Sequence, residues 1–136
     1  MALQAEFERP APPRKAPHFL TLWKIRFPIG AIASIGHRLS GLVLLVLLPP
    51  AALTLDESLR NRESFDALFA GLHAPWTALL VLAGVWAVSH HLLAGIRHLL
   101  MDAGVGSRLP RARASARLAI VFAVLCALAA AAGWRP

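Results

Sequence analysis

The sequence of 136 residues contains no tyrosine, a single cysteine and only seven acidic residues. With Cys126 alone, the chain cannot form an intrachain disulfide and lacks the cysteine cluster that an iron–sulfur centre needs. We expect this thiol to be a small buried hydrophobic side chain. There is no motif for a flavin, and residues 1–27 have no apolar central stretch, so we predict no cleavable signal peptide. These absences exclude a disulfide scaffold and a self-contained flavin or iron–sulfur enzyme.

Long apolar runs dominate what the sequence does contain. Hydrophobic residues make up 57% of the chain, which is too apolar for an ordinary soluble domain of this length. A membrane-spanning helix needs roughly 20 mostly apolar residues, and three stretches supply them, at about 28–55, 75–101 and 114–134. We therefore predict an all-α membrane protein. An N-terminal segment, 1–27, precedes a transmembrane domain, 28–136, built as a bundle of three helices.

The net charge of +7 is distributed unevenly between the two sides of the predicted bundle. Nine of the Lys and Arg residues lie on one side: five in residues 1–27, three in the loop after the second span (Arg108, Arg111 and Arg113), and Arg117 beside that loop in the first turn of the third span. Three lie on the other side (Arg60, Arg62 and Arg135). The positive-inside rule then predicts a cytoplasmic N-terminus and an outside C-terminus. The charge indicates topology and does not indicate a nucleic-acid partner.

Two consecutive prolines, Pro49 and Pro50, come late in the first predicted span. Proline removes a backbone donor and clashes with the preceding helical turn. We predict that the pair ends the helix near the outer surface or bends it there, and the helix stop is the favoured interpretation. The tryptophans near the predicted span ends are typical of interfacial anchors: Trp23 on the inner side, with Trp76 and Trp134 on the outer side.

The second predicted span carries ionisable residues on one face. At 3.6 residues per turn, His91, Gly95, His98 and Asp102 share a stripe of this helix. Ionisable groups inside a bilayer are costly and mark functional sites by default. His98 and Asp102 lie near the predicted cytoplasmic surface, where they offer a path for protons.

The first predicted span has a matching polar face formed by Ser34, His37, Arg38 and Gly41. Arg38 lies roughly 15 Å into the membrane from Pro28, at 1.5 Å per residue, and His91 lies at about the same depth. We therefore expect the polar faces of the first two spans to meet in the cytoplasmic half of the membrane. A buried arginine beside a serine predicts a pocket for a ligand that carries carbonyl or carboxylate oxygens.

A heme with two histidine ligands is a natural use for such a face, since imidazole suits iron and a helical bundle can hold the macrocycle. Cations are available for the propionates: His37, Arg38, Arg97 and His98. His90 and His91 point about 100° apart, so they cannot both line one pocket. Only His91 faces the expected pocket as a strong ligand, so a second ligand would come from a partner chain. The pattern by itself leaves heme binding and a structural hydrogen-bond network both open.

Two segments carry a resemblance to a known family. The run from Ile25 to Gly41 (IRFPIGAIASIGHRLSG) and the run from His91 to Asp102 (HLLAGIRHLLMD) resemble, in the expected order, the two signatures of the large cytochrome b anchor subunit of bacterial succinate dehydrogenase. The number of spans and the chain length are similar too, and the resemblance extends from about residue 16 onward.

The resemblance implies roles for individual residues. It places the axial heme ligand on His91, four residues before Gly95, and leaves His90 outside that register. The quinone-contacting serine and arginine of the family fall on Ser34 and Arg38. The residues near the heme propionates fall on His37, with Arg38 and His98 as further candidates. Catalytic residues for succinate oxidation are expected in partner chains and not in this one.

The resemblance also implies a multi-chain complex in the bacterial inner membrane. Its partners would be a flavoprotein with FAD, an iron–sulfur protein and a second small membrane anchor. Heme b would be shared with that second anchor, and ubiquinone would be reduced at their junction. Because this chain has no tyrosine, any tyrosine at the quinone site would come from a partner. Two alternatives stay open at this point: the anchor of a quinol:fumarate reductase, and a non-redox subunit of a small transporter.

Overall fold

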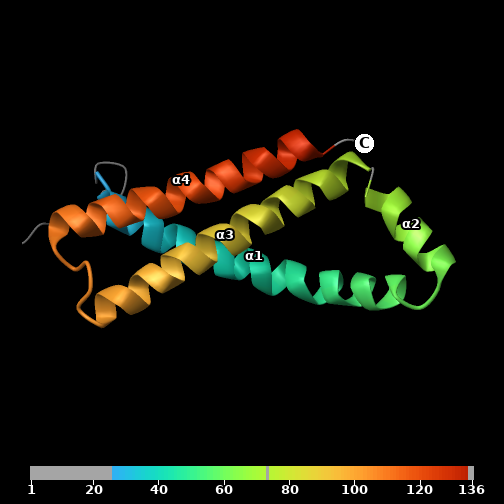
Figure 1. Cartoon of the computed structure of the whole chain (residues 1–136), viewed down its shortest axis with the longest axis horizontal. Coiled ribbons are helices and arrows are strands. Elements are labelled where there is room, and N and C mark those ends of the chain that lie inside the picture. The colour runs from blue at the N-terminus through green and yellow to red at the C-terminus, as the bar shows by residue number, and fades with distance from the viewer. Residues whose placement is uncertain (1–25, 73, 135–136) are drawn as a thin grey trace, which may run out of the picture.

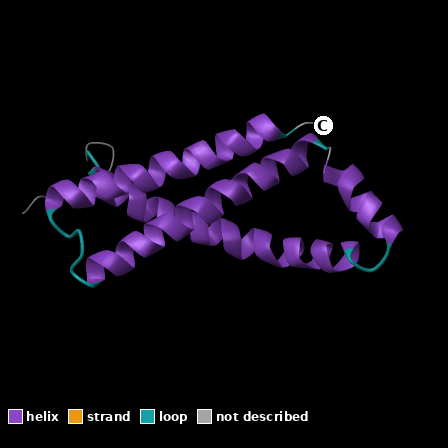
Figure 2. Ribbon diagram, viewed as in Figure 1, coloured by secondary structure: helices purple, strands orange, loops and turns teal. Residues whose placement is uncertain are grey.

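The computed structural model describes residues 26–72 and 74–134, and the described residues form four helices and no strand (Figures 1 and 2). The helices are α1 (Ile29–Ser58), α2 (Arg62–Leu72), α3 (Pro75–Asp102) and α4 (Leu109–Gly133). Residues 1–25, including the predicted anchor Trp23, lie outside the described part. The three predicted spans correspond to α1, α3 and α4, which confirms the all-α architecture.

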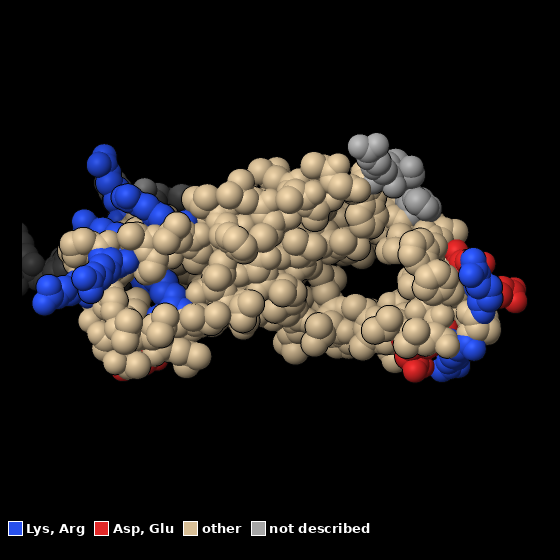
Figure 3. Space-filling model, in the orientation of Figure 1, with Lys and Arg blue, Asp and Glu red and all other residues tan. Residues whose placement is uncertain are grey.

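Length and surface character both fit helices that cross a membrane. The three long helices have 30, 28 and 25 residues and are apolar enough to span. At 1.5 Å per residue each is longer than the hydrocarbon core of about 30 Å. Figure 3 shows Lys, Arg, Asp and Glu at the two ends of the molecule, with an uncharged surface between them. Large apolar side chains stand exposed on that middle surface, as lipid-facing side chains do, among them Leu45 and Leu118.

The long helices pack through small side chains. α3 packs against both α1 and α4, and α1 also touches α4. Within residues 26–72 and 74–134, the buried hydrophobic side chains are all alanines: Ala33, Ala87, Ala94, Ala116, Ala119 and Ala123. In a membrane the lipid is as apolar as leucine, so helices associate where small residues let their backbones approach closely. This alanine seam brings the polar side chains of α1 and α3 within reach of each other.

The proline pair does not end α1, so the predicted helix stop is wrong. The helix passes through Pro49 and Pro50 and continues to Ser58. Inside membranes, hydroxyl side chains help to satisfy backbone groups near prolines. Here the Thr54 hydroxyl lies 3.0 Å from the carbonyl oxygens of both Pro50 and Ala51.

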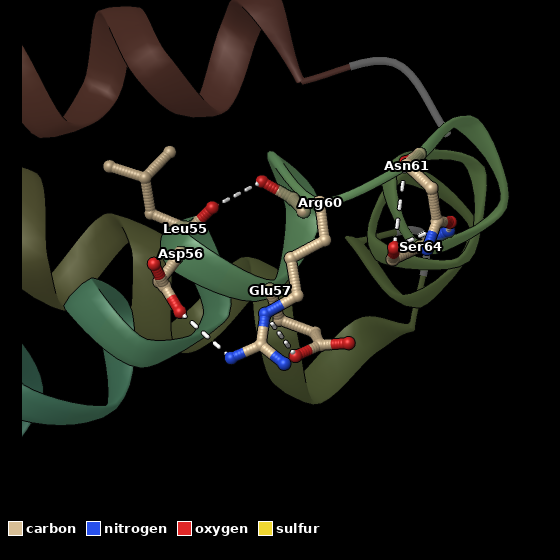
Figure 4. A network of polar contacts seen from close by, with 7 residues as sticks. Leu55, Asp56, Glu57, Arg60, Asn61 and Ser64 are labelled. Carbon is tan, nitrogen blue, oxygen red and sulfur yellow. Dashed lines mark hydrogen bonds and ion pairs between the residues drawn. The ribbon is translucent and has the colours of Figure 1, made fainter.

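A helix that the charge pattern did not reveal, α2, follows α1. Its residues lie between the first two predicted spans, where hydropathy predicts no helix. Asn61 caps it, because the Asn61 side-chain oxygen accepts a hydrogen bond of 2.9 Å from the Ser64 backbone amide. Before it, Arg60 pairs with Asp56 and Glu57 at the end of α1, at 3.1 and 3.2 Å (Figure 4). These exposed pairs add little stability but give a folded connection.

The turn between α3 and α4 closes one helix and starts the next earlier than the sequence predicts. Gly104 has a φ of +81°, and the amides of Gly104 and Val105 bond back to the carbonyls of Met101 and Leu100. This is the Schellman arrangement, in which a residue of positive φ closes a helix, and glycine adopts that conformation without steric cost. α4 begins at Leu109, not at about 114, because Pro110 is well placed in a first turn. Arg111 and Arg113 therefore belong to the helix and not to the loop.

Candidate functional site

Where α1 and α3 pack together, three imidazoles form a stack. The rings of His37 and His91 have centroids 4.2 Å apart with 21° between their planes. The rings of His37 and His98 have centroids 5.2 Å apart with 24° between planes. The polar faces of the two helices therefore meet at one level of the bundle, as the depth argument predicted. The stacked rings occupy the interface between α1 and α3. A ligand can therefore approach the histidines only at the edge of this interface.

Backbone and side-chain groups of α1 hold His91 in place. Its Nδ1 atom lies 3.1 Å from the His37 carbonyl oxygen and 3.3 Å from the Ser40 hydroxyl. A carbonyl oxygen can only accept, so Nδ1 carries the proton and donates it. A Cβ atom at Gly41 would stand 3.0 Å from Cε1 of His91, so the glycine provides the room for this ring. The arrangement leaves Nε2, the other ring nitrogen, with its lone pair available.

The neighbouring histidine also reaches α1, one turn away. His90 is 2% exposed, and its Nε2–H donates to the Ala33 carbonyl oxygen over 3.2 Å. A Cβ atom at Gly36 would stand 2.6 Å from Nε2, so only glycine fits there. The ring also stacks with Trp86, with centroids 5.7 Å apart. His90 therefore clamps α1 to α3. Among the described residues its Nδ1 has no hydrogen-bond partner.

The predicted polar face of α1 divides into an inner and an outer part. His37 and Gly41 contact α3, whereas Ser34 is half-buried and Arg38 is exposed. Arg38 makes no ion pair with any described residue; the three that occur lie at the α1–α2 end. An arginine at this depth needs an anion, a carbonyl or water. Something outside the described chain must therefore satisfy Arg38 in the membrane.

Arg97 contacts α4 and not the histidine stack, and its role as a propionate cation stays a prediction. Its Nε donates to the Ser115 hydroxyl over 3.2 Å, and its Nη2 donates to the Ala112 carbonyl over 3.3 Å. Arg97 thus binds α3 to the first turns of α4. Arg97 and His98 are adjacent in the sequence, but neighbouring residues on a helix point about 100° apart. Adjacency to His98 therefore does not predict that Arg97 faces the histidines.

The two residues of the predicted proton path differ in their surroundings. His98 is half-buried, and its Nδ1–H donates to the Ala94 carbonyl over 2.6 Å, one turn back on the same helix. Asp102 is exposed at the end of α3. The structure therefore provides an exposed carboxylate one turn from an imidazole that stacks on His37.

Ser40 is a member of the site that the sequence pattern did not single out. Its side chain is fully buried, with its hydroxyl 2.9 Å from the His37 carbonyl and 3.3 Å from His91 Nδ1. The signal was present in the sequence, since Ser40 lies one turn after His37 and next to the glycine that faces His91. Ser40 and the His37 carbonyl together fix the orientation of the His91 ring.

Comparisons with known proteins show what this chain is similar to. Residues 12–130 match the family described as succinate dehydrogenase/fumarate reductase transmembrane subunit. The chain is 41% identical over 112 residues to a succinate dehydrogenase cytochrome b556 subunit of Coxiella burnetii (strain RSA 493 / Nine Mile phase I), covering 82% of this chain and 90% of the relative. It is 33% identical over 104 residues to the subunit of the same name from Paracoccus denitrificans, covering 76% and 79%.

Proposed function

The chain belongs to the succinate dehydrogenase/fumarate reductase transmembrane subunit family, and from that membership we propose that it anchors the enzyme, helps to bind heme b and forms part of a ubiquinone-reduction site. It is a cytochrome b556 membrane subunit of succinate dehydrogenase. Both relatives are succinate dehydrogenase subunits, which favours succinate oxidation over fumarate reduction as the physiological direction. The observation that carries the heme assignment is the hydrogen bond from His91 Nδ1 to the His37 carbonyl.

The residues present fit a b-type heme. Histidines that ligate a metal usually donate their other ring N–H to a carbonyl or carboxylate, which fixes the tautomer and the ring orientation. His91 has this arrangement, and Ser40 adds a second contact to the same nitrogen. We infer that His91 would hold the heme iron through Nε2, together with a ligand from the second anchor. When bound, heme b supplies a one-electron carrier inside the membrane.

The cations near this ligand suit the propionates. His37 stacks against His91, His98 stacks against His37, and Arg38 lies on the outer part of the same helix face. Two propionate carboxylates in a membrane need positive or hydrogen-bonding partners. We infer that His37, Arg38 and His98 serve them. Because the α1–α3 seam is filled by the imidazole stack, the macrocycle would lie at the edge of this chain and be shared with a partner.

Ser34 and Arg38 provide the polar contacts that a quinone needs. They lie one helical turn apart, Ser34 half-buried and Arg38 exposed, on an otherwise apolar helix. Small-molecule sites combine apolar walls with a few placed polar groups. In our proposal the Ser34 hydroxyl donates to a quinone carbonyl, and the Arg38 guanidinium stabilises negative charge on the ring. Asp102 and His98 would deliver protons from the cytoplasmic side.

From the family resemblance we infer that the soluble partners are a flavoprotein and an iron–sulfur protein; this chain itself has neither a flavin motif nor a cysteine cluster. We place them on the side of the membrane where α3 ends and α4 begins. A second small anchor would complete the heme and quinone sites against the outer part of α1. The bacterial inner membrane is the compartment that this assembly implies.

Membranes that lack this chain, compared with membranes in which it is restored, test the proposed function. We expect the restored membranes to regain a low-spin b-type heme spectrum and succinate:ubiquinone reductase activity together. Succinate oxidation by a soluble artificial acceptor serves as the control, because its chemistry lies in the soluble partners. Restored quinone reduction without any b-type spectrum would contradict the heme assignment. A restored spectrum without quinone reduction would contradict the quinone assignment.

The orientation of the bundle follows from the arginine and lysine asymmetry and can be tested separately. In the sequence, nine of these residues lie in residues 1–27 or between the second span and the start of the third, against three that follow the first or the third span. We expect an N-terminus in the cytoplasm and a C-terminus outside. A reporter that functions only outside the cytoplasm should be active when it is fused after Pro136. Activity of a cytoplasm-only reporter at the same position would reverse the topology.

A further inference from the structure

A groove separate from the histidine site lies between the second half of α3 and the first half of α4. It encloses about 380 Å³. We call it the α3–α4 groove; the side chains that the argument uses are Ile96, Arg97, Leu100, Arg111, Leu118 and Phe122. The walls are predominantly apolar, and Ile96, Leu118 and Phe122 are 45%, 70% and 54% exposed. The groove therefore opens outward from the bundle, toward lipid.

The groove and the histidine stack lie on different faces of α3. His91 and His98 point toward His37 on α1. Ile96 and Leu100 are about half a turn away from them and point toward α4. None of the four described histidines, His37, His90, His91 and His98, lines the groove. A ligand bound there would not compete with heme or quinone for the same side chains, so this inference stands apart from the proposed function.

Positive charge gathers at one end of this groove. Arg97 and Arg111 are part of its lining, and the exposed Arg108 is the N-cap residue of α4, the helix that carries Arg111. Figure 3 shows Lys and Arg concentrated at that end of the molecule. Arg97 uses Nε and Nη2 within the chain, which leaves Nη1 free to donate outward. Within the described ranges these arginines form no ion pair, not even with exposed Asp102.

We propose that the α3–α4 groove binds an anionic phospholipid from the leaflet at the α3–α4 turn. The arginines hold the phosphate, since a guanidinium matches phosphate geometry and can donate two parallel hydrogen bonds. One acyl chain lies along Leu118 and Phe122. Basic pockets between membrane helices on the positively charged side attract anionic head groups, at about 1 kcal/mol per basic residue near the surface. That energy corresponds to about fivefold in affinity.

Photolabelling of the intact succinate dehydrogenase complex tests this site. Two probes carry the same diazirine-bearing acyl chain, one on phosphatidylglycerol and one on phosphatidylcholine. We expect phosphatidylglycerol to label peptides around Ile96–Leu100 and Leu118–Phe122 at least about fivefold more strongly. Arg111→Gln should reduce this preference about fivefold, and Arg111→Lys should retain most of it. Arg113→Gln, an exposed arginine on the same helix but outside the lining, should change it less than twofold.

Four results would overturn the proposal. Equal labelling by the two probes, or equal loss in Arg111→Gln and Arg113→Gln, would mean that the lipid is held only by general attraction. Absence of lipid labelling would mean that a partner helix or nothing fills the groove. Displacement of the phosphatidylglycerol probe by inorganic phosphate at a comparable concentration would identify a soluble anion site. Heme content and complex size, measured in each variant, ensure that only assembled complexes are compared.

Discussion

Replacing His91 with alanine is expected to abolish the low-spin b-type heme spectrum of the assembled complex. The substitution removes the ring whose Nδ1 is held by the His37 carbonyl at 3.1 Å and whose Nε2 we assign to iron. A low-spin heme with two histidine ligands needs both, so loss of one changes or removes the spectrum even where heme stays in place. Reduced-minus-oxidised spectra of purified complex, normalised to flavin content, make the measurement.

The adjacent His90 provides a matched control. His90→Ala removes a buried ring and its hydrogen bond to the Ala33 carbonyl. The substitution should therefore lower the free energy of unfolding by roughly 2–4 kcal/mol. His90→Gln restores a donor and should recover part of that loss. In both variants the complexes that assemble should keep the low-spin spectrum. A lost spectrum in His90→Gln together with a normal one in His91→Ala would exchange the ligand assignment.

Replacing Ser34 with alanine is expected to lower ubiquinone reduction about 5- to 150-fold and leave succinate oxidation by an artificial acceptor nearly normal. A hydrogen bond that matters in the transition state is worth about 1–3 kcal/mol. Arg38→Leu should have a larger effect, because quinone and propionate both use that charge in our assignment. Arg38→Lys should recover part of the activity by keeping the charge without the planar fork. The assay compares both acceptors at equal amounts of assembled complex.

A second serine on α1 separates the quinone site from the heme site. Ser40 is buried against His91, whereas Ser34 is half-buried beside the exposed Arg38. Ser40→Ala should alter the heme spectrum or its reduction potential, and Ser34→Ala should alter neither. Equal loss with both acceptors in Ser34→Ala would indicate an assembly defect. Unchanged rates in Ser34→Ala and Arg38→Leu would remove these residues from the quinone site.

Much of the fold could be predicted because the membrane imposes a simple rule. A helix of about 20 apolar residues satisfies its own backbone in lipid, so hydropathy alone identified α1, α3 and α4. Helix ends depend on single capping contacts that hydropathy does not register. The hydrogen bond from Ser64 to Asn61 starts α2, and Pro110 starts α4 earlier than the apolar run suggests. The Pro49–Pro50 pair misled because a membrane helix tolerates proline where neighbouring helices and local backbone adjustments satisfy the freed groups, so α1 continues through both prolines.

The candidate site could be predicted only as far as helical periodicity reaches. Periodicity correctly brought His37 and His91 to one level, because a 1.5 Å rise converts sequence position into depth. It could not tell that α1 turns His37 and Gly41 inward and Arg38 outward, since that rotation is set by the alanine seam and by Gly36 beneath His90. For the same reason it missed that Arg97 binds α4.

The outward position of Arg38 has a consequence for how the cell makes this subunit. A newly inserted copy carries an exposed guanidinium roughly 15 Å below the membrane surface, with no acidic partner in the described chain. Until another subunit covers it, that side chain must draw water or head groups into the bilayer at an energetic cost. We therefore expect an unassembled copy to be less stable in the bilayer than the assembled subunit. Synthesis of this subunit is therefore expected to be matched to that of its companions, and surplus copies to be short-lived.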